Sequence, residues 1–371
     1  MQFSMIFEAQ LADPTRQNER QVIRACVEQA VLADEMGYDR VWSVEHHCLE
    51  QYAHMSAPEV FLSYVAAKTT RIRVGHGVVC LPFNYNHPIR VAERIAMLDI
   101  LSGGRVDFGA GRGATEQELH AFGIAREDTQ AQLEESLHMI SRIWQDDVFE
   151  WHGDLLDVPP RPIIPRPVQD PHPPMYLACT RQDTLNLAGR LGIGALCLGF
   201  AGPDDMAVKR KVYDEAIAAR SPGDMVGAFA VDHMSSLCPA MVLDDREKAR
   251  RIGLKGQRFF TEAINHWYTG GPPPRTDTDD EANDEVLRRR GEKLVAYLSE
   301  EKIEIGTEAT GLFNPNHAYG TVADAVDYVG RLADAGADEV MFLMQMGTVP
   351  QAAILESITN IGQKVIPQFR G

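Results

Sequence analysis

The segment TVADAVDYVGRLADAGADEVMFLM (321–344) predicts a helix followed by a strand. From Val322 to Ala333 the apolar residues recur at steps of three and four, which is the spacing of one face of an amphipathic helix. Gly336 stands where a left-handed helix cap is expected, and the apolar run 339–344 after it predicts a buried strand. A helix that leads directly into a buried strand is typical of α/β proteins with parallel sheets.

The same alternation of short apolar runs and helical patterns continues over almost the whole chain. It predicts eight strands, at residues 3–8, 40–44, 72–81, 106–110, 175–179, 194–198, 226–237 and 339–344. Parallel strands need crossover connections, and eight of them can close without leaving an edge strand unpaired. We therefore expect a (β/α)8 barrel, the TIM barrel of the α/β class. We expect one domain over residues 1–371, with insertions at about residues 146–174 and 268–317.

Composition and charge exclude several classes of function. The chain has 371 residues, of which 44% are hydrophobic, and this is enough apolar material for a large core. Its 36 basic and 53 acidic residues give a net charge of −17 without a basic stripe, so we expect no nucleic-acid partner. No apolar run approaches the roughly 18 residues that span a membrane, and the N-terminus has no basic leader. Because its six cysteines lack CxxC spacing, we expect a cytoplasmic protein with reduced thiols.

Two segments interrupt the alternation. Residues 146–174 are rich in proline and aromatic residues, and residues 269–285 contain GGPPPR followed by the acidic tract TDTDDEANDE. The acidic tract has too few apolar residues to pack in a core, so it is either a surface insertion or a mobile lid over the active site. Because it follows the seventh strand's unit and Gly270–Gly271 can act as a hinge, we expect a lid.

In a (β/α)8 barrel the chemistry takes place at the carboxyl ends of the strands, where GAGRGA (109–114) follows the fourth strand. The motif formally matches the dinucleotide fingerprint, but it does not open the fold, and Arg112 occupies the turn where bare backbone should approach a pyrophosphate. Two interpretations remain. The glycines only turn the chain, or they clear space so that Arg112 presents its guanidinium to a single phosphate.

Glu45–His46–His47 follows the second strand, and three interpretations of it are open. They are a core histidine, general acid or base catalysis, and hydrogen bonding to a bound cofactor. Adjacent strand residues point to opposite faces, so we expect only one of the two histidines in the barrel mouth. We predict no metal site, because there is no HExxH motif and no third ligand at a recognisable spacing. Gly75 and Gly77 in the third strand indicate either ordinary barrel packing or the close approach of something flat and large.

Four segments of the chain resemble the bacterial luciferase-like flavin monooxygenase superfamily, in the family's order. They are ADEMGYDRVWSVEHH (33–47), TTRIRVGHGVVCLPFNYNHPIRVAERIAMLDILSGGRVDFGAGRG (69–113), PHPPMYLACTRQDTLNLAGRLG (171–192) and YGTVADAVDYVGRLADAGADEVMF (319–342). The family fold is a (β/α)8 barrel, which agrees with the eight strands predicted from the apolar pattern.

The resemblance implies a two-component monooxygenase that oxygenates a small organic substrate. Such enzymes receive reduced flavin mononucleotide (FMN) from a separate NAD(P)H:flavin reductase and react it with O2 through a flavin hydroperoxide. His46, with Glu45 and His47 of the same motif, stands at the catalytic position. The resemblance assigns the remaining residues to flavin binding, with Gly77 and Val78 forming a cis peptide behind the flavin ring and the phosphate held by Arg112, Thr180, Arg181 and Thr184. We also expect a homodimer.

The sequence departs from the family pattern at several places. Gly111 replaces the reactive cysteine of the luciferases, so light emission is not implied, and Arg181 replaces a small hydroxyl residue and adds positive charge. The acidic stretch 277–285 shares no motif with the family's mobile loop. Two alternatives are a deazaflavin-dependent oxidoreductase that transfers hydride without oxygen, and a non-catalytic flavin-binding relative.

Overall fold

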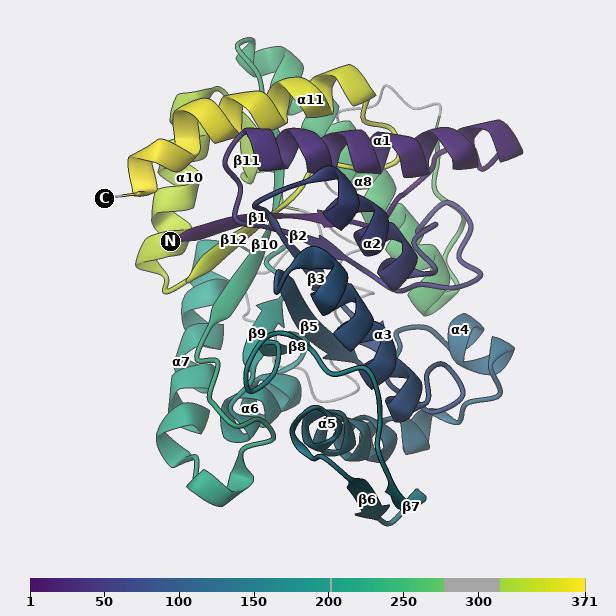
Figure 1. Ribbon diagram of the computed structural model, residues 1–371. Helices are drawn as coiled ribbons and strands as arrows, with labels where there is room; N and C mark the ends of the chain where they lie inside the picture. Colours follow the sequence, from purple (N-terminus) through teal and green to yellow (C-terminus); the bar gives the residue numbers. More distant parts are fainter. Residues whose placement is uncertain (201, 277–313, 371) are drawn as a thin grey trace.

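The computed structural model describes residues 1–200, 202–276 and 314–370. Its centre is a ring of parallel strands in which each strand pairs with the next (Figure 1). The ring consists, in order, of β1 (Gln2–Phe7), β2 (Arg40–Ser43), β3 (Arg73–His76) with β4 (Val79–Cys80), β5 (Val106–Gly111), β8 (Met175–Cys179), β9 (Gly194–Cys197), β10 (Met234–Val242) and β12 (Glu339–Leu343). It closes because β10 pairs with both β9 and β12, and β12 pairs with β1. The predicted (β/α)8 barrel is confirmed.

Helices surround this barrel (Figure 1). They are α1 (Arg16–Glu35), α2 (Pro58–Lys68), α3 (Pro88–Ser102), α5 (Thr129–Gln145), α6 (Gln182–Leu191), α7 (Pro203–Ala219), α8 (Arg246–Thr269), α10 (Val322–Asp334) and α11 (Gln351–Asn360), with the short α4 (Glu116–Ala121) between β5 and α5. The helix predicted from residue 322 is α10, which buries Ala325, Val329 and Leu332 as its apolar spacing requires. Gly336 follows it with a left-handed φ of 94°.

The seventh strand differs from the prediction. A strand was expected at residues 226–237, but β10 begins at Met234 and continues to Val242, where it also pairs with β11 (Ala318–Gly320). The apolar residues before Met234 make other backbone contacts, because the N–H groups of Val226 and Val231 donate to Leu191 and Gly192 near the end of α6. An apolar run predicts burial, but it does not decide which backbone partners the chain finds.

The third strand is divided in two rather than continuous over residues 72–81. The peptide bond Gly77–Val78 between β3 and β4 is cis. Gly109 of β5 is also required at this point, because a Cβ atom on it would lie 2.1 Å from the His76 carbonyl oxygen. The glycines of these two strands therefore mark a close approach of backbones at the carboxyl end of the barrel.

The two predicted insertions have different outcomes. Residues 146–174 contain an antiparallel hairpin formed by β6 (Phe149–His152) and β7 (Asp157–Arg161), which the sequence did not indicate. Of the predicted lid at residues 269–285, positions 277–285 lie outside the described residues, so the lid stays a prediction. In the described part, Gly270 ends α8 with a φ of 68°, and Arg275 contacts the buried Glu262 through its backbone N–H (2.8 Å) and its guanidinium (3.0 Å).

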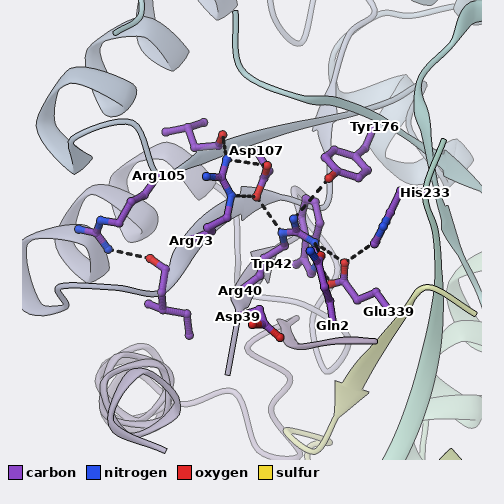
Figure 2. A network of polar contacts seen from close by, with 12 residues as sticks. Gln2, Asp39, Arg40, Trp42, Arg73, Arg105, Asp107, Tyr176, His233 and Glu339 are labelled. Atoms are coloured by element: carbon purple, nitrogen blue, oxygen red, sulfur yellow. Dashed lines mark hydrogen bonds and ion pairs between the residues drawn. The ribbon is translucent and has the colours of Figure 1, made fainter. Parts of the chain in front are cut away.

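Buried charges fill the barrel interior at the amino ends of the strands, and Figure 2 shows this network. Arg40 of β2 donates from Nε to Asp107 Oδ2 (2.7 Å) and forms a second ion pair with Glu339 of β12. Arg73 of β3 binds both oxygens of Asp107, at 2.7 and 2.8 Å. Glu339 is also 2.8 Å from His233 Nε2. Two arginines thus face two carboxylates, and every one of these four groups is paired.

Candidate active site

At the opposite end of the barrel, a helix cap positions the carboxylate that binds His46. α4 begins with a capping box in which Glu118 Oε2 accepts hydrogen bonds from the N–H (3.1 Å) and hydroxyl (2.8 Å) of Thr115. The other oxygen of Glu118 is therefore free to bind His46 Nδ1 (2.9 Å) and the backbone N–H of His47 (3.0 Å). Glu118 was not predicted from the sequence, although TEQE (115–118) is a recognisable capping-box pattern that marks the start of α4.

His46 is held in one orientation, and its raised pKa makes the imidazole cationic at neutral pH. Burial alone would lower its pKa, but the Glu118 carboxylate outweighs burial and raises the pKa of His46 to about 9. Because Nδ1 faces Glu118, the other ring nitrogen, Nε2, faces Glu8, the residue that follows β1, at 3.9 Å from its Oε2. The Tyr52 ring lies beside the imidazole, with 5.1 Å between ring centroids.

Glu45 and His47 form a second pair beside this site. One oxygen of the buried Glu45 accepts from the backbone N–H of Cys80 (2.6 Å), and the other lies 3.2 Å from His47 Nε2. Asn86 donates to both oxygens. The His47 ring stacks on Tyr85, with centroids 5.7 Å apart. Of the two histidines only His46 approaches Glu8, although strand alternation is not the reason, because β2 ends at Ser43. Glu45 thus connects β4 to His47, and the predicted catalytic role of the two residues stays a prediction.

A cavity of about 370 Å³ brings together most of the residues predicted to bind phosphate. Its lining residues are Arg112, Gln130, Glu134, Arg181, Asp183, Thr184, Asn186, Leu187 and Arg190. Arg181 precedes α6, so the cavity lies at a helix N-terminus, whose backbone dipoles favour an anion. Thr180 is exposed and does not line this cavity. The Thr184 hydroxyl donates to the Arg181 carbonyl oxygen (2.8 Å) and so stabilises the start of α6.

Val78 occupies the space beside Gly111, the position at which luciferases carry cysteine. A Cβ atom on Gly111 would lie only 2.4 Å from Val78 Cγ2. Cys80 of β4 pairs with Gly111 across the sheet, which fixes the two backbones relative to each other. A side chain at position 111 therefore competes with Val78, which gives a steric reason for glycine there.

Two features are absent from residues 1–200, 202–276 and 314–370, which the structure describes. Among them, no three histidine, cysteine, aspartate or glutamate side chains come together as a metal site. No helix in the same residues is long and apolar enough to cross a membrane.

Most of the chain matches a family of known proteins. Residues 1–339 match the family described as luciferase-like monooxygenase. The chain belongs to this family. It is 33% identical over 377 residues to the oxygenase component of flavin-dependent trigonelline monooxygenase from Acinetobacter baylyi, a match that covers 100% of this chain and 96% of the relative. The protein is accordingly an enzyme of the luciferase-like monooxygenase family, whose named relatives include several monooxygenases.

Two other matches differ in the cofactor that their names state. The fold is similar to the oxygenating constituent of 3,6-diketocamphane monooxygenase from Pseudomonas putida, solved in complex with FMN, with a TM-score of 0.75, 18% identity and coverage of 99% of this chain and 98% of that one. The chain is also 32% identical over 184 residues to an F420-dependent glucose-6-phosphate dehydrogenase from Amycolatopsis mediterranei, covering 48% of this chain and 54% of the relative. Flavin and deazaflavin relatives therefore both exist.

Proposed function

We propose that this protein is the oxygenase component of a two-component monooxygenase. It takes reduced FMN from a separate NAD(P)H:flavin reductase and uses O2 to oxygenate a small organic substrate. The observation that carries the proposal is the cavity at the start of α6, where Arg112 and Arg181 meet around a space suited to one phosphate. Bound reduced FMN would supply the electrons that activate dioxygen.

The chain's own residues then have distinct tasks. Arg112 and Arg181 would bind the phosphate, and the Gly77–Val78 peptide would lie behind the flavin ring. His46 would hold a proton at Nε2, because Glu118 binds its Nδ1 and keeps the imidazole protonated at neutral pH. The buried Tyr52, whose ring lies beside His46, would help to exclude bulk water from the reacting atoms.

The phosphate assignment is tested by the Arg112→Ala variant. Charge-assisted hydrogen bonds of this kind contribute roughly 1.5–3 kcal/mol each, so the variant should bind reduced FMN about tenfold or more weakly. Riboflavin has no phosphate and provides the control, because its affinity should hardly change. The measurement is an anaerobic fluorescence titration of both flavins. Equal losses for both would show that Arg112 does not bind the phosphate.

The role of His46 is tested by the His46→Ala variant, which should fold and bind reduced FMN. Loss of the proton-holding group should slow productive oxygenation by roughly 10²–10⁴-fold and release hydrogen peroxide instead. The measurement is the ratio of oxygenated product to hydrogen peroxide per NADH consumed, with a substrate identified by screening. A normal ratio would return His46 to the role of a core histidine.

The relative named as F420-dependent supports a second candidate, hydride transfer from a reduced deazaflavin. Reduced FMN and reduced F420 can be compared directly by equilibrium binding and by oxygen uptake. Tighter binding of F420 without oxygen uptake would replace the first proposal by the second.

The proposed homodimer has a candidate surface on α2 and α3, which pack against each other. Large apolar side chains are exposed there, namely Val60, Tyr64, Met97, Ile100 and Leu101. Burying such a patch against a second copy would remove it from water. Light scattering should give twice the chain mass for the wild type and a single chain mass for Leu101→Glu. A monomeric wild type would contradict the proposal.

A further inference from the structure

Glu8 lies at the carboxyl end of β1, and the chain holds its backbone firmly. The backbone turns away immediately after it, with a positive φ of 52° at Ala9. The N–H of His54 donates to the Glu8 carbonyl oxygen (3.1 Å). Gln10 and Gln345 exchange hydrogen bonds of 2.7 and 2.8 Å, which join this turn to the end of β12. The Glu8 side chain is thus directed into the barrel mouth by a rigid support.

The Glu8 carboxyl has bonding capacity that the described part of the protein does not use. Its side chain is 9% exposed, and its Oε2 is buried without a hydrogen-bond partner among the described residues. The charged and titratable groups that face it are His46, Glu118, Tyr52 and Tyr268. Burial raises the pKa of both tyrosines well above the usual range, so they stay neutral. His46 Nε2, at 3.9 Å, is too far for a direct hydrogen bond.

We propose that Glu8 is a proton donor and acceptor of this active site and acts with His46 on one polar atom bound between them. An atom about 2.8 Å from both Oε2 and Nε2 fits between two groups at this separation. The atom belongs to the class of oxygen or nitrogen atoms that gain or lose a proton during the reaction. The O–H bond of Glu8 breaks as an O–H or N–H bond forms on that atom, and solvent restores the proton. The inference rests on the proposed function only for the identity of the bound molecule.

The electrostatics support this role. Burial raises the pKa of Glu8 to about 7, although the neighbouring His46 opposes the rise. A general acid or base works best when its pKa is near the operating pH, since both protonation states are then available. Glu118 does not have this property, because despite its burial the pairing with His46 keeps its pKa below the usual value.

The first test uses the ligand-free enzyme and does not depend on activity. Infrared difference spectra between about pH 5 and about pH 9 should show one carboxylic-acid C=O band that disappears near pH 7 in the wild type. The band should be absent in Glu8→Gln and present in Glu8→Asp. Asp99→Asn, which removes a buried carboxylate that binds the 168–169 backbone, is the control and should keep the band. A wild type without the band, or a Glu8→Gln variant that retains it, would overturn the inference.

The second test uses the enzyme loaded with reduced FMN, without substrate. The rate of flavin reoxidation by O2, followed by stopped flow, should change with an apparent pKa near 7 in the wild type and in Glu8→Asp. In Glu8→Gln the inflection should be lost and the rate should fall roughly tenfold or more, while the affinity for reduced FMN stays the same. An unchanged pH profile would contradict the inference. If the wild type fails to bind reduced FMN, the proposed function is wrong, and the infrared test still decides whether Glu8 exchanges a proton near pH 7.

Discussion

At the amino end of the barrel Arg40 and Arg73 face Asp107 and Glu339, whereas at the carboxyl end Glu8 and Glu118 have His46 as their cationic neighbour. The carboxylates of both groups are buried, as is Arg40, whereas Arg73 and His46 are partly exposed. In the first, each charge meets a charge of opposite sign at hydrogen-bonding distance. In the second, Glu118 accepts the hydrogen bond from His46 Nδ1 and fixes the orientation of the imidazole, and Glu8 Oε2 is left without a hydrogen-bond partner in the described residues.

The pKa values of Glu339 and Glu8 are shifted in opposite directions, in line with this difference. Burial would raise the pKa of Glu339, but Arg40 and His233 hold it far below its usual range, so its charge is stabilised by the fold. Burial raises the pKa of Glu8 to about 7, so an ionised Glu8 is a cost to the fold. We infer that the amino end stabilises the barrel, whereas the carboxyl end holds a carboxyl group whose ionisation destabilises the fold, as the proton transfer proposed for Glu8 requires.

The largest expected effect is at the amino end, in Glu339→Gln. The variant removes the negative charge that pairs with Arg40 inside a buried network. Breaking one partner of a buried ion pair costs about 3–5 kcal/mol of unfolding free energy. Urea denaturation at pH 7 measures this loss. A cost below 1 kcal/mol would show that the network does not stabilise the barrel as the comparison requires.

A smaller and pH-dependent effect is expected for His46→Gln. The folded state raises the pKa of His46 from 6.5 to about 9, so the stability it contributes is complete below pH 6.5 and disappears as the pH rises through about 9. The variant should therefore lose about 3 kcal/mol at pH 6 and almost nothing at pH 10. Denaturation at both pH values gives the two numbers, and a loss that does not vary with pH would contradict the Glu118–His46 pairing.

The smallest effect is expected for Gly111→Ala, which adds one methyl group beside Val78. The new Cβ atom would lie 2.4 Å from Val78 Cγ2, and overpacking of this kind costs roughly 1–2 kcal/mol. In the double variant with Val78→Ala the cost should be largely recovered, because the colliding methyl group is gone. No recovery in thermal denaturation would show that position 111 requires glycine for another reason.

Most of the barrel could be predicted from the sequence, because strand and helix periods are local properties. The strands around residues 3–8, 40–44 and 106–110 appear where the apolar runs place them, within one or two residues. The seventh strand was misplaced because residues 226–231 are apolar, but the N–H groups of Val226 and Val231 donate to the chain at the end of α6. β10 also continues through Pro239, which has no N–H to donate and is untypical of a central strand.

The site could be predicted only where a single motif carries it. His46, Arg112 and Arg181 stand in recognisable motifs, and the structure places the two arginines at one cavity. Glu118 and Glu8 reach His46 from segments 72 and 38 residues away, so their contacts exist only after the barrel closes. A local sequence pattern cannot predict that a carboxylate lacks a hydrogen-bond partner, because its partners come from distant segments that pack around it in the folded chain.

The most direct test of the central claim compares Glu8→Gln with Glu339→Gln between about pH 5 and about pH 8.5. The folded-state pKa of Glu8 is raised from 4.5 to about 7, so the stability linked to its protonation is lost as the pH rises through that range. Glu8→Gln should therefore gain about 2–3 kcal/mol of unfolding free energy relative to the wild type between the two pH values, while Glu339→Gln is less stable than the wild type at both. If Glu8→Gln shows no relative gain at high pH, ionisation of Glu8 does not destabilise the fold and the account is wrong.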